Sequence, residues 1–165
     1  MKTLILVRHG KAEEAVLGGS DFERRLNPRG QSDAITMGKR LQQRGLIPDR
    51  ILSSASRRTV ETTRFIAMEL HFPLEEVEWE AELYHASPSA LLHAIQCCSP
   101  QVQTLMIVAH NNGLTDFANA LCGTFTDNIP TCGMVVCTME ENDWTDFETA
   151  KKTMALYDYP KRFFA

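Results

Sequence analysis

An arginine, a histidine and a glycine stand in a row after a short apolar segment near the N-terminus. Residues 4–7 are apolar, and Arg8, His9 and Gly10 follow them. Arg8 carries a planar fork of donors suited to phosphate or carboxylate, and His9 has a ring nitrogen that can take a proton or attack a phosphoryl group. Gly10 allows a sharp turn and a close approach of the backbone to a bound group. This order indicates an anion site that contains a nucleophile; the alternative is a strand that ends in polar surface residues.

Two more arginines and a second histidine follow later apolar segments. Arg57 and Arg58 fall in the first turn of a helix that we expect over residues 56–71. A helix N-terminus favours an anion, so two cations there indicate a bound anion between them and the exposed amide groups. The alternative is a surface pair, tolerated at roughly a few tenths of a kcal/mol. His110 follows the strongest strand pattern of the chain, residues 105–109.

Strand and helix patterns alternate along the chain, which predicts an α/β fold with a mostly parallel sheet covered by helices on both faces. In such folds, ligands bind beyond the carboxyl ends of the strands. Arg8 with His9, the segment 54–58 and His110 all follow strands, so we expect them to meet at one edge of the sheet. The expected strands cover residues 4–7, 50–54, part of 75–82, 105–109 and 134–139, with weaker patterns near 144–149 and 153–158, and the expected helices cover residues 28–44, 56–71, 87–98 and 114–122.

Two imidazoles and several guanidinium groups without a metal motif suit phosphoryl transfer. The sequence has no His-Glu-x-x-His motif, no cysteine pair at zinc spacing, no Gly-Lys phosphate loop and no Gly-x-Ser-x-Gly elbow. The arginines would neutralise the transferred group while His9 attacks phosphorus in line, and water would then hydrolyse the phosphohistidine. His110 would donate a hydrogen bond to the phosphoryl group or orient it. We expect no cofactor and no metal.

Three segments resemble the histidine phosphatase superfamily, which has the phosphoglycerate mutase-like fold. Residues 8–10 resemble the Arg-His-Gly signature of the family. Residues 54–62 are similar to its Ser-Pro-x-x-Arg-Ala-x-x-Thr segment, with alanine and threonine in place of the usual proline and alanine. Residues 108–111 resemble the segment that carries its second histidine. The resemblance implies one domain over residues 1–165, built as a three-layer α/β/α sandwich.

The resemblance also assigns roles to individual residues. It implies that Arg8, His9, Arg58 and His110 are catalytic, and that the two arginines and His110 bind the phosphoryl group. The activity it implies is that of a metal-independent phosphatase with a phosphohistidine intermediate on His9. The alternatives are a phosphatase for small phosphate esters and a phosphate-binding module without turnover. The presence of all four residues argues against the last.

The segment 11–27 is long and polar, as functional loops often are. Residues 21–30 read Asp-x-x-Arg-x-Leu-Asn-x-x-Gly and resemble the SixA-type phosphohistidine phosphatases. In that group the arginine, Arg24 here, would lie near the substrate, and Lys11 is a weaker candidate for the same role. The resemblance implies a phosphorylated protein as partner, such as a histidine phosphotransfer domain or a phosphocarrier, and the alternative is a small phosphorylated metabolite.

The proton donor is open on sequence grounds. An alcohol is a poor leaving group, so phosphate esters need a general acid, whereas a protonated imidazole leaves readily. Larger family members supply this acid from a carboxylate, and Glu82 stands at about that place in the chain. Either Glu82 faces the pocket and ester substrates fit, or it is one more exposed glutamate and phosphohistidine is favoured. His71, His85 and His93 are expected to be ordinary surface or boundary histidines.

Composition limits the partners and the compartment. The net charge of −4 argues against a broad nucleic-acid-binding surface. The sequence shows no secretory signal and no segment of transmembrane length. Five cysteines without an export signal are expected to be reduced thiols. We therefore expect a cytoplasmic protein that binds neither nucleic acid nor membrane.

Overall fold

A six-stranded sheet forms the centre of the computed structural model, which describes residues 1–162. The strand order is β3-β2-β4-β1-β5-β6. In this sheet β5 runs antiparallel to both of its neighbours, and the pairs among β1, β2, β3 and β4 are all parallel. The predicted mostly parallel sheet is therefore confirmed. The strands are β1 (Lys2–Arg8), β2 (Arg50–Ser54), β3 (Glu78–Glu80), β4 (Thr104–Ala109), β5 (Met134–Met139) and β6 (Lys152–Asp158).

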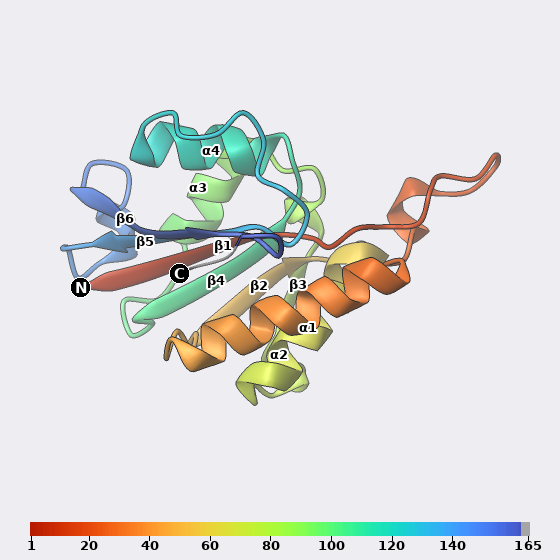
Figure 1. Cartoon of the computed structure of the whole chain (residues 1–165). Coiled ribbons are helices and arrows are strands. Elements are labelled where there is room, and N and C mark those ends of the chain that lie inside the picture. The colour runs from red at the N-terminus through yellow and green to blue at the C-terminus, as the bar shows by residue number, and fades with distance from the viewer. Residues whose placement is uncertain (163–165) are drawn as a thin grey trace.

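Helices cover both faces of the sheet, as predicted. Figure 1 shows α1 (Pro28–Gln43) and α2 (Arg57–Leu70) on one face, and α3 (Pro88–Gln96) and α4 (Gly113–Cys122) on the other. The result is the expected three-layer α/β/α arrangement. Short 3-10 helices lie in the connections of the described chain: η1 (Asp21–Glu23), η2 (Leu74–Glu76), η3 (Ala81–Leu83) and η4 (Trp144–Asp146).

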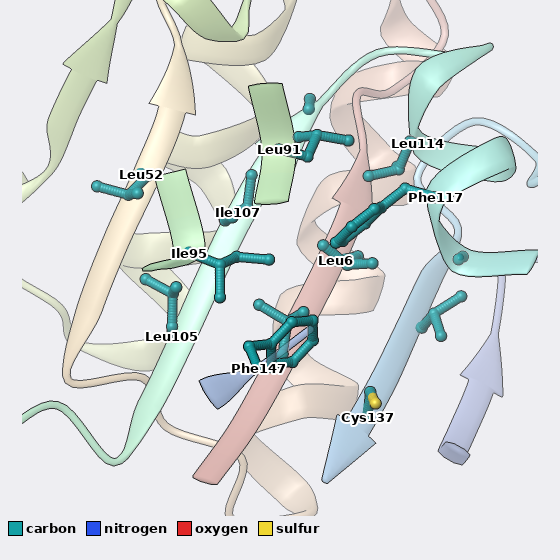
Figure 2. Packing of buried hydrophobic residues seen from close by; sticks show 14 of the residues in the cluster. Leu6, Leu52, Leu91, Ile95, Leu105, Ile107, Leu114, Phe117, Cys137 and Phe147 are labelled. Atoms are coloured by element: carbon teal, nitrogen blue, oxygen red, sulfur yellow. The ribbon is translucent and has the colours of Figure 1, made fainter. Parts of the chain in front are cut away.

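The central strand β1 divides its side chains between two cores because successive residues of a strand point to opposite faces. Leu4 and Leu6 pack under α3 and α4, while Ile5 and Val7 pack against α1 and α2, and all four are fully buried. Figure 2 shows the first core, where Leu6 lies beneath Phe117. Burial of each such side chain stabilises the fold by roughly 1.5–3 kcal/mol. The strand that ends at Arg8 is thus held from both sides.

The helix starts follow from capping residues. Asn27 accepts a hydrogen bond from the amide of Gly30 at 2.8 Å, which fixes the start of α1. Ser56 stands at the N-cap of α2, as its sequence predicts, but its hydroxyl bonds that of Thr59 at 2.7 Å instead of a backbone amide. The buried face of α2 includes Thr59 and Thr62, and Val60 is half-buried.

The weak strand pattern near 144–149 is wrong, whereas the one near 153–158 is confirmed as β6. The first region forms η4 because Trp144 is drawn into the core, where its indole N–H donates to the carbonyl of Val102 at 2.8 Å. Asp143 caps the turn by accepting from the amide of Thr145 at 3.0 Å. A buried anchor and a cap outweigh the strand preference of a short segment.

The segment between β1 and α1 extends well beyond the body of the molecule (Figure 1). A single bridge between Ala12 and Leu26 closes its base, and η1 lies on its returning side. Near its tip, Val16 is largely exposed at 71% and Leu17 is fully exposed at 107%. Across residues 1–162, none of the helices combines the length and the apolar character needed to cross a membrane.

Candidate active site

Strand register brings the two predicted histidines together. Arg8 pairs with Ala109 across the parallel strands β1 and β4, so His9 and His110 follow at the same level. The backbone amide of His9 donates to the carbonyl of Ala109 at 3.2 Å, and the two ring centroids lie 5.3 Å apart. The expected meeting of the two imidazoles at the carboxyl edge of the sheet is confirmed.

Hydrogen bonding sets the tautomer of His9. Its Nδ1 lies 2.7 Å from the carbonyl oxygen of Gly10. Because a carbonyl oxygen only accepts, Nδ1 carries the proton and Nε2 keeps its lone pair. The Nε group of Arg58 approaches Nε2 at 3.4 Å, at the long end of hydrogen-bond distances. Nε2 is thus the ring nitrogen that keeps a lone pair, and it faces a guanidinium group.

Two close contacts fix the turn after His9. The amide of Gly10 donates to the Thr62 hydroxyl at 2.9 Å, and this hydroxyl donates to the carbonyl of Arg58 at 2.7 Å. A Cβ on Gly10 would lie 2.9 Å from the carbonyl oxygen of Gly30. Glycine is therefore required here for close packing against the start of α1.

Arg58 joins three parts of the site and is 3% exposed. Its Nη1 donates to the backbone carbonyl of Asp21 at 2.8 Å, and its Nη2 lies 3.1 Å from the carboxylate of the same residue. Nη2 also lies 3.4 Å from Nδ1 of His110. Arg57, next to it, is exposed and lies 3.7 Å from Glu61 on the surface. Of the two arginines at the start of α2, only Arg58 therefore reaches the site.

His110 is buried at 1% exposure, and both of its nitrogens have partners. Nε2 lies 2.8 Å from the hydroxyl of Ser54 at the carboxyl end of β2, and Nδ1 faces Arg58. Arg58 can only donate, so Nδ1 accepts and Nε2 donates to the serine. Ser54 and Arg58 therefore fix the orientation of this ring.

Arg8 has a donor without a partner. Its Nη1 donates to the carbonyl of Ile129 at 2.7 Å, but its Nε is buried and unpaired within the described chain. Buried donors are almost always satisfied, so an orphaned one calls for an explanation. Arg8 lines the same cavity as His9, where an oxyanion would satisfy it.

These side chains surround a cavity of about 300 Å³. The cavity holds four guanidinium or ammonium groups and three imidazoles, but its wall also includes one carboxylate. Its lining is Arg8, His9, Lys11, Ala12, Asp21, Arg24, Arg58, His85, His110, Asn111 and Thr131. Such a surplus of cations around a histidine favours a phosphate-sized anion.

Arg24 belongs to this wall because the SixA-like segment folds back onto the site. Its Nη1 lies 3.0 Å from the carboxylate of Asp21, and its Nε donates to the carbonyl of Glu13 at 2.9 Å. A Cβ on Gly30, at the end of the same segment, would lie 2.2 Å from the carbonyl oxygen of Lys11. The spacing of Asp21, Arg24 and Gly30 in residues 21–30 thus allows the loop to pack against the site.

Glu82 lies elsewhere. It lines a separate cavity of about 280 Å³ together with Arg50, His93 and Cys97. It is not part of the wall around His9 because η3 buries Leu83 and leaves Glu82 exposed to solvent. The geometry gives no support to Glu82 as proton donor.

The site contains three residues to which sequence reasoning assigned no role. Asp21 accepts hydrogen bonds from Tyr84 and from His85, the latter at 3.2 Å, in addition to Arg58. The expectation that His85 is an ordinary boundary histidine is wrong, because it lines the cavity. A topological signal was available: His85 follows β3, which is parallel to β2, so it too lies beyond the carboxyl end of a strand.

Burial and the surrounding cations keep both central histidines neutral. Burial lowers the pKa of His9 to about 4, with a further lowering by the nearby arginines, against the raising effect of the Gly10 carbonyl. Burial lowers the pKa of His110 to about 3, with His9 and Arg58 adding to the effect. Asp21 has its pKa held well below the usual range, first by the hydrogen bond from Tyr84. At neutral pH the Nε2 atom of His9 therefore carries no proton.

These shifts predict a pH dependence of stability. Both pKa values lie below the ordinary 6.5, so the unfolded chain binds protons on these histidines before the folded one does. The contribution is complete above about pH 6.5 and is lost as the pH falls toward 4 and then 3. An NMR titration of imidazole nitrogens should place both midpoints below pH 5, with a matching fall in the free energy of unfolding. Midpoints near 6.5 for both rings would contradict this assignment.

Comparisons with known proteins agree with the geometry. Residues 4–85 match the sequence model of the Histidine phosphatase superfamily (branch 1). The Mycobacterium leprae protein ML1117 is 27% identical over 151 residues, which cover 86% of this chain and 90% of that protein. The crystal structure of a candidate phosphohistidine phosphatase SixA from Agrobacterium tumefaciens superposes with a TM-score of 0.84 at 25% identity, covering 96% of this chain and 98% of the other. The protein histidine phosphatase SixA complexed with tungstate shares the fold, with a TM-score of 0.79 at 20% identity over 96% of this chain and 97% of the other.

The chain therefore belongs to the histidine phosphatase superfamily, a class of phosphatases. Within this class it is of the SixA type. Among the described residues, no cluster of three or more histidine, cysteine, aspartate or glutamate side chains is arranged to hold a metal ion.

Proposed function

We propose that the protein removes phosphoryl groups from phosphohistidine in a signalling protein, through a phosphohistidine formed on its own His9. The observation that carries the proposal is the environment of His9 Nε2: a lone pair fixed by the Gly10 carbonyl and placed among guanidinium groups. Arg8 and Arg58 would hold the oxygens of the transferred group and offset their charge in the transition state.

The reaction would proceed in two displacements. Nε2 of His9 attacks phosphorus, the bond from phosphorus to the leaving nitrogen breaks, and its electron pair leaves with the substrate imidazole. Water then attacks the phosphorus on His9, the bond to Nε2 breaks, and the lone pair returns to the ring. The products are the dephosphorylated histidine and inorganic phosphate. Neither displacement uses a metal ion, so we expect turnover to survive EDTA.

The position of Glu82 supports phosphohistidine over an alkyl phosphate. A sugar or alkyl phosphate needs a strong proton donor at the leaving oxygen, and the carboxylate expected to supply one lies in another cavity. An imidazole leaves more readily. The likeness to SixA structures, one of them bound to tungstate, points in the same direction. The five cysteines, all free thiols, fit the proposed cytoplasmic compartment.

The projecting loop supports a protein rather than a metabolite as the phosphoryl donor. Its base contributes Asp21 and Arg24 to the cavity, and Val16 and Leu17 are exposed near its tip. Exposed apolar side chains on a projecting loop that also contributes to the site suit contact with a partner surface. A phosphorylated metabolite would not reach them.

Replacing Leu17 by serine should impair turnover of the protein substrate more than that of a small one. Loss of one buried leucine contact costs roughly 1.5–3 kcal/mol, which is about ten- to hundredfold in kcat/KM. The ratio of kcat/KM for a phosphorylated histidine phosphotransfer domain to that for p-nitrophenyl phosphate should fall by this factor. Met68→Ser is the matched control, since Met68 is exposed at 64% near the far end of α2.

The outcomes separate the possible substrates. An unchanged kcat/KM ratio in Leu17→Ser would show that the loop does not dock the protein substrate. Faster turnover of sugar phosphates than of the phosphorylated protein would favour a phosphatase for small esters. Phosphate affinity with no turnover of either substrate would identify a binding module.

A further inference from the structure

His85 stands in the wall of the cavity that also contains His9. Its ring centroid lies 4.9 Å from that of His110 and 4.3 Å from that of Tyr84. About half of the side chain is exposed, so it is open to an incoming substrate as well as to the cavity. None of the steps derived above uses this imidazole.

The backbone holds His85 in an uncommon conformation. Its φ is +50°, in the left-handed region that residues other than glycine seldom adopt. The next residue packs tightly against the start of α4, since a Cβ on Gly113 would lie 1.9 Å from the carbonyl oxygen of Ala86. Backbone strain of this kind persists where the surroundings enforce it, and it gathers at active sites.

Asp21 pairs with the ring. The Nε2 of His85 lies 3.2 Å from the Asp21 carboxylate, which also accepts from Tyr84 and Arg58. A carboxylate can only accept from His85, so the pair orients the ring and leaves Nδ1 for another partner. Aspartate–histidine pairs of this form act as acids and bases in many enzymes.

We propose that His85, oriented by Asp21, is the general acid and base of the reaction. This inference rests on the proposed function and places an imidazole, rather than the carboxylate of Glu82, at the leaving group. In the first step, protonated His85 gives its proton to the leaving nitrogen or oxygen as the bond to phosphorus breaks, and becomes neutral. In the second step, neutral His85 takes a proton from the water that attacks phosphohistidine, and returns to its starting state. Protons and electron pairs balance over the cycle.

The test measures how turnover depends on the leaving group. The His85→Asn variant keeps a residue that tolerates the left-handed backbone, and His85→Gln checks the result with a longer side chain. His93→Asn is the matched control, because His93 lies on α3 in the other cavity. Each protein is assayed with a phosphohistidine protein and with phenyl, 4-nitrophenyl and 2,4-dinitrophenyl phosphate, whose leaving groups need progressively less protonation.

Loss of the acid should lower kcat/KM for phenyl phosphate by about 100- to 10,000-fold. The loss should shrink steadily toward the dinitrophenyl ester, so that the dependence on the leaving group steepens in both variants. A loss that is equal for all three esters would overturn the proposal, because a merely structural role affects every substrate alike. Unchanged rates would overturn it as well.

The proposed function is tested separately by the unaltered protein. If it turns over neither the phosphohistidine protein nor the aryl esters, the function itself fails. If it turns over only the phosphohistidine protein, the aryl esters cannot serve as the test. The role of His85 is then tested by the solvent deuterium isotope effect on phosphoenzyme formation. The effect should be present in the unaltered protein and lost in His85→Asn; an effect that persists there would overturn the role of His85.

Discussion

Replacing His9 by alanine should abolish turnover, with a loss of at least about 10,000-fold in kcat. The variant lacks the nitrogen that accepts the phosphoryl group. His110 is the nearest imidazole, but its Nδ1 already faces Arg58 and its Nε2 faces Ser54. The fold should remain intact, because β1 is held by its apolar residues on both faces and not by the histidine after it.

The measurement is kcat on p-nitrophenyl phosphate and on a phosphohistidine protein, with circular dichroism and thermal unfolding to verify the fold. His93→Ala serves as the histidine control, since it lies in the cavity that contains Glu82 and should retain full activity. If the His9→Ala protein kept activity near that of the unaltered chain, His9 would not be the nucleophile.

Replacing Arg58 by lysine should lower kcat by about 1,000-fold or more, close to the effect expected for alanine. The guanidinium contacts the backbone and carboxylate of Asp21 while it faces Nε2 of His9 and Nδ1 of His110. An ammonium group is a point charge that cannot make these contacts together.

The neighbouring Arg57 provides a matched control. It carries the same charge in the same helical turn, but it is exposed and faces Glu61 on the surface. Arg57→Lys should therefore leave kcat within about twofold, in line with the small energies of surface ion pairs. Because lysine keeps the charge at both positions, equal losses in the two variants would contradict the role given to the contacts of Arg58.

The part of the site that the sequence predicts correctly is the part set by strands. His9 and His110 each follow a continuous apolar run, and the register of parallel strands leaves little freedom in where such residues lie. Arg58 is placed by the first turn of a helix, which is almost as well defined. Apolar pattern, strand order and helix start are properties of short segments, and the sequence expresses them directly.

The part that escapes prediction depends on loops. Asp21 reaches Arg58, Tyr84 and His85 only after the segment between β1 and α1 folds back, and no local pattern encodes that path. Glu82 stands three residues before His85, yet the turn of η3 sends one to a separate cavity and the other to the site. Sequence position near a site therefore does not decide which of two polar residues enters it.

The most direct measurement for the central claim is the location of the phosphoryl group in the reacting enzyme. The protein is mixed with radiolabelled phosphohistidine protein, quenched in base within milliseconds, digested and analysed by mass spectrometry. The account predicts a phosphoenzyme labelled on His9, stable in base and labile in acid, as expected of a phosphorus–nitrogen bond. Label on a carboxylate, shown by the opposite stability, or turnover without any label on His9, would contradict it.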